Sequence, residues 1–356
     1  MLIYTGLAIA LLFLIVVSFL NKAVFGSEPD GNKFDSFPNF RNESFQNQSV
    51  TPMMTEEGSY WKIIKEMLNK SKNVNPSKTL SVIKTDLKSL STECNYVVWF
   101  GHSSYLLVLD GKHILVDPVF YKASPLSFFG KPFKTSYEYK PTDFPEIDFL
   151  VVTHDHYDHL DYRVACELKP KVKNVITSKG VDEHFKLWGF KEEQMIALNW
   201  NDIAIVDGFE FTCLPARHFS GRKFKRSQTL WSSFALKTAT ANIYLGGDSG
   251  YDIHFKEIGQ KHGPFDLAIL ECGQYNNYWP FIHMMPEETL QASIDLRAKS
   301  LLPVHWGKFT LATHPWTEPV ERLIAANIDE TQSILTPQIG EVLGIGSENK
   351  TGKWWR

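Results

Sequence analysis

The stretch Thr153-His154-Asp155-His156-Tyr157-Asp158-His159-Leu160-Asp161 follows directly on the apolar run Phe149-Leu150-Val151-Val152. The apolar run predicts a buried strand, and the polar residues begin where that strand ends. Three histidines and Asp158 fall within six positions, a density that suits zinc or a similar divalent ion. His154 and His156 are two residues apart, so an extended backbone would turn both rings to the same side. We interpret the stretch as a metal-binding loop.

The composition restricts the classes of protein that fit. The chain has 356 residues, of which 43% are hydrophobic, and a formal net charge of −3. This length fits one large domain or two smaller ones, and we favour one catalytic domain with an N-terminal extension. The basic excess of a nucleic-acid-binding domain is missing, so we expect no nucleic-acid partner. The cysteines are far apart and form no Cys-x-x-Cys pair, which favours a reducing compartment without disulfides.

Residues 2–20 are almost wholly apolar. The length of this run matches the roughly 20 residues that a helix needs to cross a bilayer. A signal peptide would carry a positive charge before this run, and no lysine or arginine precedes Leu20. We therefore predict a transmembrane anchor over residues 1–25. Lys22, Lys33 and Arg41 follow it, which by the positive-inside rule predicts a membrane protein with a single-pass N-terminal anchor and a cytoplasmic catalytic domain.

Two further segments complete the predicted organisation, a linker and helical extension over 26–92 and a catalytic domain over 93–350. Ser59 is expected to cap a helix that carries Trp61 on one face, and the leucines between residues 80 and 90 predict a second helix. The lysines of this extension form either a solvated surface or contacts with anionic lipid. Residues 120–144 form a long aromatic loop, whose rings would build a satellite core or meet acyl chains.

Polar residues recur at the ends of predicted strands in the catalytic region. Paired strands come first and strand-plus-helix units later, which predicts an α/β fold of the α+β type, a two-sheet sandwich with helices outside. Buried histidines and aspartates need partners, and a pair of metal ions would supply them all at once. We expect seven metal ligands: His154, His156 and His218 on one ion, Asp158, His159 and His305 on the other, and Asp248 bridging the two.

The motif His154-x-His156-x-Asp158-His159 resembles the metal motif of the metallo-β-lactamase superfamily. Further stretches make the chain, from about Phe37 to its end, similar to the N-acyl-phosphatidylethanolamine-hydrolysing phospholipase D family. These stretches include Trp99-Phe100-Gly101-His102, Asp117-Pro118-Val119-Phe120, Pro215-Ala216-Arg217-His218, Gly247-Asp248-Ser249-Gly250-Tyr251 and Val304-His305-Trp306-Gly307. The resemblance implies a metallo-β-lactamase-type αββα sandwich with two zinc ions, here joined to the predicted N-terminal transmembrane helix.

The resemblance also implies roles for residues beside the ions. Tyr157 and His283 match positions that contact the substrate in the family. Asp158 and His283 are the expected catalytic residues. Asp158 would orient the nucleophile or accept its proton, and His283 would hydrogen-bond the substrate or protonate the leaving group. Arg222 lies in a basic loop after His218, which would either attract the phosphate of the substrate or form a solvated surface.

The expected function is zinc-dependent hydrolysis of N-acyl-phosphatidylethanolamine to N-acylethanolamine and phosphatidic acid, a reaction of the phospholipase D type. A lactonase or other carbonyl hydrolase of the same fold is one alternative, and a non-catalytic scaffold is another. The seven intact ligands speak against a scaffold, and the aromatic loop and the anchor favour a lipid substrate. The implied partners are a phospholipid substrate and a membrane, and a homodimer is compatible with the resemblance.

Overall fold

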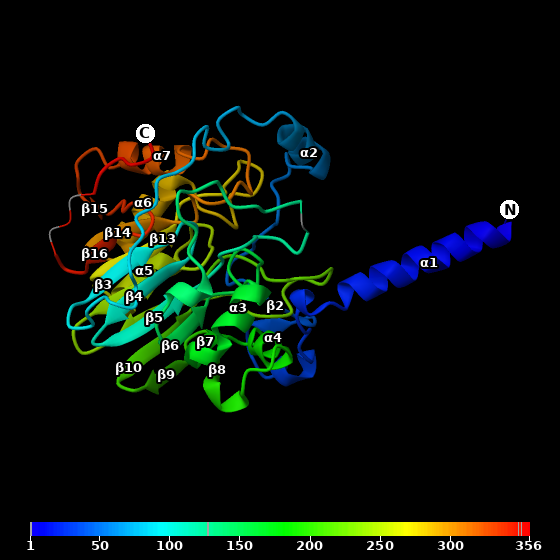
Figure 1. Cartoon of the computed structure of the whole chain (residues 1–356), viewed down its shortest axis with the longest axis horizontal. Coiled ribbons are helices and arrows are strands. Elements are labelled where there is room, and N and C mark those ends of the chain that lie inside the picture. The colour runs from blue at the N-terminus through cyan, green and yellow to red at the C-terminus, as the bar shows by residue number, and fades with distance from the viewer. Residues whose placement is uncertain (1, 127, 348, 350) are drawn as a thin grey trace.

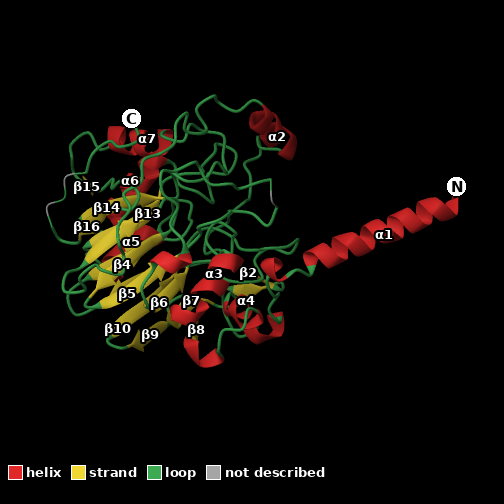
Figure 2. Ribbon diagram, viewed as in Figure 1, coloured by secondary structure: helices red, strands yellow, loops and turns green. Residues whose placement is uncertain are grey.

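The computed structural model describes residues 2–126, 128–347, 349 and 351–356. Two seven-stranded sheets are stacked face to face, with helices on the outside (Figure 1, Figure 2). In spatial order the first sheet contains β16 (Val342–Gly344), β3 (Tyr96–Trp99), β4 (Tyr105–Leu109), β5 (Lys112–Val116), β6 (Ile147–Val152), β7 (Val172–Ser178) and β8 (Met195–Leu198). The second contains β15 (Ser333–Ile334), β14 (Ser300–Val304), β13 (Leu267–Glu271), β12 (Asn242–Leu245), β11 (Ser233–Lys237), β10 (Phe209–Leu214) and β9 (Ile203–Val206).

The core lies between the two sheets. The ring of Phe149 in β6 lies 5.3 Å from the ring of Phe209 and 5.1 Å from that of Phe211, both in β10. All six residues of β6 are buried, as expected for a parallel strand that is covered on both faces. The predicted mixed α/β sandwich with outer helices is confirmed.

The helices pack on the outer surfaces of the sheets. The elements beside the first sheet are α3 (Tyr162–Leu168) and α4 (Asp182–Leu187), and those beside the second are α5 (His254–His262), α6 (Pro286–Asp295) and α7 (Glu318–Ala326). Phe255, Leu290 and Leu323, one from each helix of the second set, are buried together with residues of β13 and β14. Their apolar contacts close the outer side of the second sheet.

The parallel strands determine where polar side chains converge. β5 pairs in parallel with β6, and β12, β13 and β14 run parallel to one another. In such sheets the carboxyl ends of neighbouring strands meet at one edge, and the loops that follow them carry the binding residues. The metal loop follows β6 at this edge, and the segments that carry Asp248 and His305 follow β12 and β14.

The N-terminal helix α1 (Leu2–Leu20) extends away from the body of the molecule (Figure 1). A helix needs about 20 apolar residues to span the hydrocarbon core of a bilayer, which is about 30 Å thick. Throughout the part of the chain that the structure describes, no helix combines the length and the apolar character needed to cross a membrane. The prediction of a transmembrane anchor over 1–25 is therefore wrong, and so is the single-pass membrane localisation that was derived from it.

The extension lies against the body. The short strands β1 (Phe40–Arg41) and β2 (Ser44–Phe45) pair, and the rings of Phe34, Phe40 and Phe45 are buried with the main core. The helix α2 (Tyr60–Leu68) begins after Ser59, which caps it as expected. Residues 80–90, all of which are described, contain no helix, so that prediction is wrong. The amides of Leu80 and Ile83 instead bind the carbonyls of Lys134 and Ile339 in neighbouring segments.

The aromatic loop over 120–144 is partly buried and partly exposed. Phe120, Phe133 and Phe144 are buried. Phe128 is 76% exposed and Phe129 is 43% exposed. Part of the loop therefore joins the body of the protein, while its tip presents apolar side chains to the surroundings.

Candidate metal centre

Three histidines and one aspartate form a first group of donor atoms at the carboxyl edge of the sheets. Nδ1 of His156 lies 3.0 Å from Nε2 of His154 and 3.2 Å from Nε2 of His218. Oδ2 of Asp248 lies 3.8 Å from Nε2 of His154 and 3.7 Å from Nε2 of His218. One donor atom from each of these four residues lies within 4.8 Å of the others, so a single ion could contact all of them.

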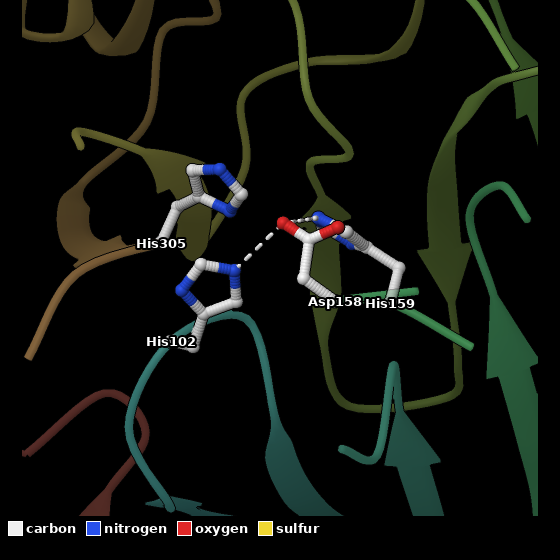
Figure 3. Close-up of side chains that lie close together, drawn as sticks. All are labelled: His102, Asp158, His159 and His305. Atoms are coloured by element: carbon white, nitrogen blue, oxygen red, sulfur yellow. Dashed lines mark hydrogen bonds and ion pairs between the residues drawn. The ribbon is translucent and has the colours of Figure 1, made fainter. Parts of the chain in front are cut away.

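A second group contains Asp158, His159 and His305 together with His102 (Figure 3). Nε2 of His102 lies 3.1 Å from Oδ2 of Asp158. Nε2 of His159 and Nδ1 of His305 lie 3.1 Å and 3.2 Å from Oδ1 of Asp248. In Figure 3, His102 and His305 come from segments far from Asp158 in the sequence, whereas His159 follows Asp158 directly.

Asp248 lies between the two groups. Its Oδ2 faces His154 and His218, whereas its Oδ1 faces His159 and His305. Gly247 lets the backbone pass close to the metal loop, because a Cβ at this position would meet Cβ of Thr153 at 3.0 Å and the carbonyl oxygen of Ser232 at 2.6 Å. The structure thus brings the seven ligands predicted from the sequence into two adjacent groups that share Asp248.

Several donor atoms are oriented as a metal site requires. Among the described residues, Nε2 of His159 and Oδ1 of Asp248 are buried and make no hydrogen bond. Nδ1 of His159 lies 2.7 Å from Oδ2 of Asp117, and Nδ1 of His218 lies 2.8 Å from the carbonyl oxygen of Ile282. When Nδ1 donates its proton to such an acceptor, the Nε2 lone pair is free for a cation. The residues therefore fit a divalent metal.

The charge states also suit a cation. Burial lowers the pKa of His154, His218 and His305 well below the usual range, so these rings are neutral. Burial alone would raise the pKa of Asp158 and Asp248, but the neighbouring histidines hold both well below their usual range. Burial would lower the pKa of His159, but the carboxylates of Asp248 and Asp117 raise it well above its usual range, so this ring would release its proton when a cation binds.

His283 lies beside both groups and is held by Glu271. The ring of His283 lies 5.0 Å from the ring of His218 and 5.3 Å from that of His305. Its Nδ1 is 2.8 Å from Oε2 of Glu271, whose Oε1 accepts hydrogen bonds from two backbone amides at 3.0 Å. Burial would lower the pKa of His283, but the charge and hydrogen bond of Glu271 outweigh it and raise the pKa to about 9.

Tyr157 and Arg222 contact each other at the metal loop. The Arg222 guanidinium lies 4.1 Å from the Tyr157 ring, and the Tyr157 hydroxyl donates to the Arg222 carbonyl oxygen. Arg222 is buried, and its guanidinium donates to the carbonyl oxygens of Val24, Asp155 and Leu160. The structure does not bring this guanidinium to the two ligand groups. Phosphate binding by Arg222 and substrate contact by Tyr157 stay predictions.

His102, Asp117 and Glu271 were not predicted from the sequence as site residues. Each comes at the end of a strand or just after it: His102 after β3, Asp117 after β5, and Glu271 as the last residue of β13. A polar residue at the end of an apolar strand is the same signal that identified three of the predicted ligands. Applied to every strand, it would have found these residues as well.

Comparison with known proteins gives consistent results. The family model described as the beta-lactamase superfamily domain matches residues 112–306. An uncharacterised protein of Mycobacterium tuberculosis is 37% identical over 325 residues, which cover 90% of this chain and 87% of that protein. The N-acyl-phosphatidylethanolamine-hydrolyzing phospholipase D 1 of Caenorhabditis elegans is 33% identical over 268 residues, covering 69% of this chain and 75% of that protein. The solved structure of Igni18, a metallo hydrolase of Ignicoccus hospitalis, aligns with a TM-score of 0.53 and 23% identity over 70% of this chain and 97% of that chain.

Proposed function

We propose that this chain, which belongs to the metallo-β-lactamase superfamily of metal-dependent hydrolases, uses two zinc ions to hydrolyse N-acyl-phosphatidylethanolamine-type lipids. The products would be an N-acylethanolamine and phosphatidic acid. The observation that carries the proposal is the position of Asp248, whose two oxygens face two different histidine groups. The similarity to the C. elegans enzyme, which is named for this substrate, supports the choice of lipid.

Each group would hold one ion. His154, His156 and His218 would hold the first and Asp158, His159 and His305 the second, and Asp248, whose two oxygens face the two groups, would contribute to both. When bound, a pair of zinc ions provides Lewis-acid charge for the phosphoryl oxygens and lowers the pKa of water. The other steps of the proposal depend on residues of the chain itself.

We assign to Asp158 the role of accepting the proton of the attacking water. Its side chain is 15% exposed, whereas that of Asp248 is 2% exposed, so solvent reaches Asp158 more readily. Its Oδ2 is 3.1 Å from Nε2 of His102, which holds the carboxylate in one orientation. A positioned carboxylate of this kind acts as a general base.

We assign His283 two roles: it donates a hydrogen bond to the phosphodiester, and it protonates the leaving group. Its Nδ1 donates to Glu271, which leaves Nε2 for the substrate. The nearby Glu271 carboxylate stabilises the protonated ring, which can donate a hydrogen bond where negative charge develops. The same proton can pass to the departing ethanolamine oxygen.

Exposed apolar side chains supply contacts for the acyl chains. Trp61 of α2 is 80% exposed, and Phe128 in the loop after β5 is 76% exposed. Figure 1 shows α2 and this loop on the same side of the body. Trp and Phe side chains insert favourably into the interface of a lipid aggregate, so we assign them to its surface.

Incubation with N-acyl-phosphatidylethanolamine in mixed micelles tests the function. Mass spectrometry should detect both N-acylethanolamine and phosphatidic acid in equal amounts. Asp248→Asn should form neither product, while Asp329→Asn, an exposed aspartate, serves as the matched control and should retain activity. Release of free fatty acid, or hydrolysis of a lactone with the phospholipid intact, would contradict the proposal and support a carbonyl hydrolase.

A further inference from the structure

Asp155 stands in the metal loop between its first two histidines and is itself buried. Its Oδ1 accepts a hydrogen bond from the amide of Gly221 at 2.7 Å. Its Oδ2 accepts from the Thr229 hydroxyl at 2.9 Å and lies 3.1 Å from Nε2 of His184. These contacts fix the backbone that carries the two flanking histidines.

His184 connects Asp155 to the N-terminal part of the chain. The amide of Ser27 donates to Nδ1 of His184 at 3.0 Å. In the neutral ring the proton then sits on Nε2, where it is donated to Asp155. The orientation of the Asp155 carboxylate therefore depends on the backbone amide of Ser27, which lies far earlier in the chain.

The backbone next to Ser27 makes two more close contacts behind the loop. Gly26 has φ +69°, and a Cβ at this position would overlap Nδ1 of His184. The carbonyl oxygen of Val24 accepts from Nε and Nη2 of Arg222 at 3.2 and 2.8 Å. Nη1 of the same guanidinium donates to the carbonyl oxygen of Asp155 at 2.7 Å. Val24 thus satisfies the donors of a buried cation that would otherwise lack acceptors.

Asn47 holds the third histidine of the same group. Its Nδ2 donates to the carbonyl oxygen of His218 at 2.8 Å, and its Oδ1 accepts from the His218 amide at 3.1 Å. The second group is held by residues of the main body instead: Asp117 binds His159, and Ser103 lies 2.9 Å from Nδ1 of His305.

We infer that residues 24–47, here called the strap, orient the ligands of the first group and thereby set the affinity for the ion at His154, His156 and His218. The strap leaves the ion of the second group largely unaffected. The inference rests on the proposed pair of ions. Groups that orient metal ligands typically change metal affinity by about 10–100-fold when they are removed.

Zinc titration of the full-length chain tests the inference. The protein is stripped of metal with a chelator and titrated with zinc against a chelating indicator. Gly26→Ala should weaken one of two binding steps by about tenfold or more and leave the other within about twofold. Gly208→Ala is the matched control, because Gly208 has φ +83° and a Cβ there meets nothing within 4 Å. It also places an alanine at a positive φ, and it should leave both steps unchanged.

A second pair of variants separates positioning from general destabilisation. His184→Ala should weaken the same binding step as Gly26→Ala. His184→Gln offers one acceptor and one donor, so it should recover part of the lost affinity. Urea unfolding of each metal-free variant reports the change in stability, and affinity should not follow stability across the series.

Unchanged zinc affinity in Gly26→Ala and His184→Ala would overturn the inference, and so would equal weakening of both steps. Failure of the proposed substrate gives a different result. A wild-type chain that binds two zinc ions and shows the strap effect, but leaves the phospholipid intact, contradicts the substrate and supports the inference.

Discussion

Nδ1 of His159 lies 2.7 Å from Oδ2 of Asp117, and both side chains are buried. The same carboxylate accepts hydrogen bonds from the amide and the hydroxyl of Thr153 at 2.9 and 2.7 Å. It therefore cannot turn away from the ring, and Nε2 of His159 faces Asp248 at 3.1 Å. A carboxylate in this position fixes the tautomer of a metal-binding imidazole and increases its basicity.

Asp117→Asn should weaken zinc binding by about 10–100-fold, because the amide no longer supplies the charge that makes His159 a strong ligand. Dialysis against graded chelator concentrations, followed by elemental analysis, measures the loss. Asp148→Asn is the control, a buried aspartate in β6 that pairs with Lys112 and Lys173 and accepts a hydrogen bond from the amide of His113. It should keep its zinc, and full zinc retention in Asp117→Asn would show that the pair does not support the ligand.

His102→Ala should lower kcat by about tenfold or more, because Asp158 loses the ring that lies 3.1 Å from its carboxylate. His102→Gln keeps a side-chain donor and should retain more activity than the alanine variant. Steady-state kinetics with the phospholipid, at saturating zinc, compare the three chains. Equal activity in all three chains would show that His102 does not support catalysis.

His283→Ala should retain its zinc while turnover falls by about 100-fold, because His283 is proposed to contact the substrate and not the metal. Glu271→Gln should show a smaller loss, because the amide can still accept a hydrogen bond from His283 but carries no charge. Elemental analysis beside kinetic assays distinguishes the roles. Loss of zinc in His283→Ala would make this residue a metal ligand instead.

Elemental analysis of the purified wild-type chain should give about two zinc ions per chain, because the two oxygens of Asp248 face two different donor groups. Asp248→Asn should bind zinc weakly at both groups, since each loses one oxygen anion. A wild-type chain that is active without metal would contradict the proposed chemistry, whereas iron or manganese at the same ratio would contradict only the identity of the ion.

Acid should destabilise the protein through His254, which is buried against Phe255 with its pKa lowered to about 4 because burial disfavours the charged ring. The ordinary value is 6.5, so the unfolded chain takes up the proton first as the pH falls. The stabilising contribution is therefore complete above pH 6.5 and is lost between pH 6.5 and about 4. It amounts to a few kcal/mol, about 1.4 kcal/mol for each pH unit.

His254→Leu should show a weaker dependence of unfolding free energy on pH across this range. The metal ligands titrate there too, so urea unfolding of metal-free wild type and metal-free variant is compared. Their difference isolates the contribution of His254. A difference that is constant from pH 7 to pH 4 would show that the ring does not carry this effect.

Local patterns in the sequence were sufficient for the sandwich fold and for the seven residues that the structure gathers into two groups. The apolar run of β6 and the histidines that follow it are neighbours in the chain, so their relationship needs no tertiary information. Asp248 and His305 follow apolar strands in the same way, and parallel strands bring their carboxyl ends to one edge. Periodicity failed over residues 80–90, because hydrogen bonds to distant segments decided that conformation.

Only the tertiary structure decided which residues support those ligands. Asp117, Glu271 and His184 are paired with the metal loop or with His283 through contacts that cross between strands, helices and loops. The strap contacts Arg222 and His184 behind the loop through backbone groups of Val24 and Ser27. Because every residue carries a backbone carbonyl, and every residue except proline an amide N–H, the side-chain pattern of the sequence does not predict these contacts. Side-chain chemistry along the chain selects the metal donors, whereas their orientation depends on hydrogen bonds that exist only after folding.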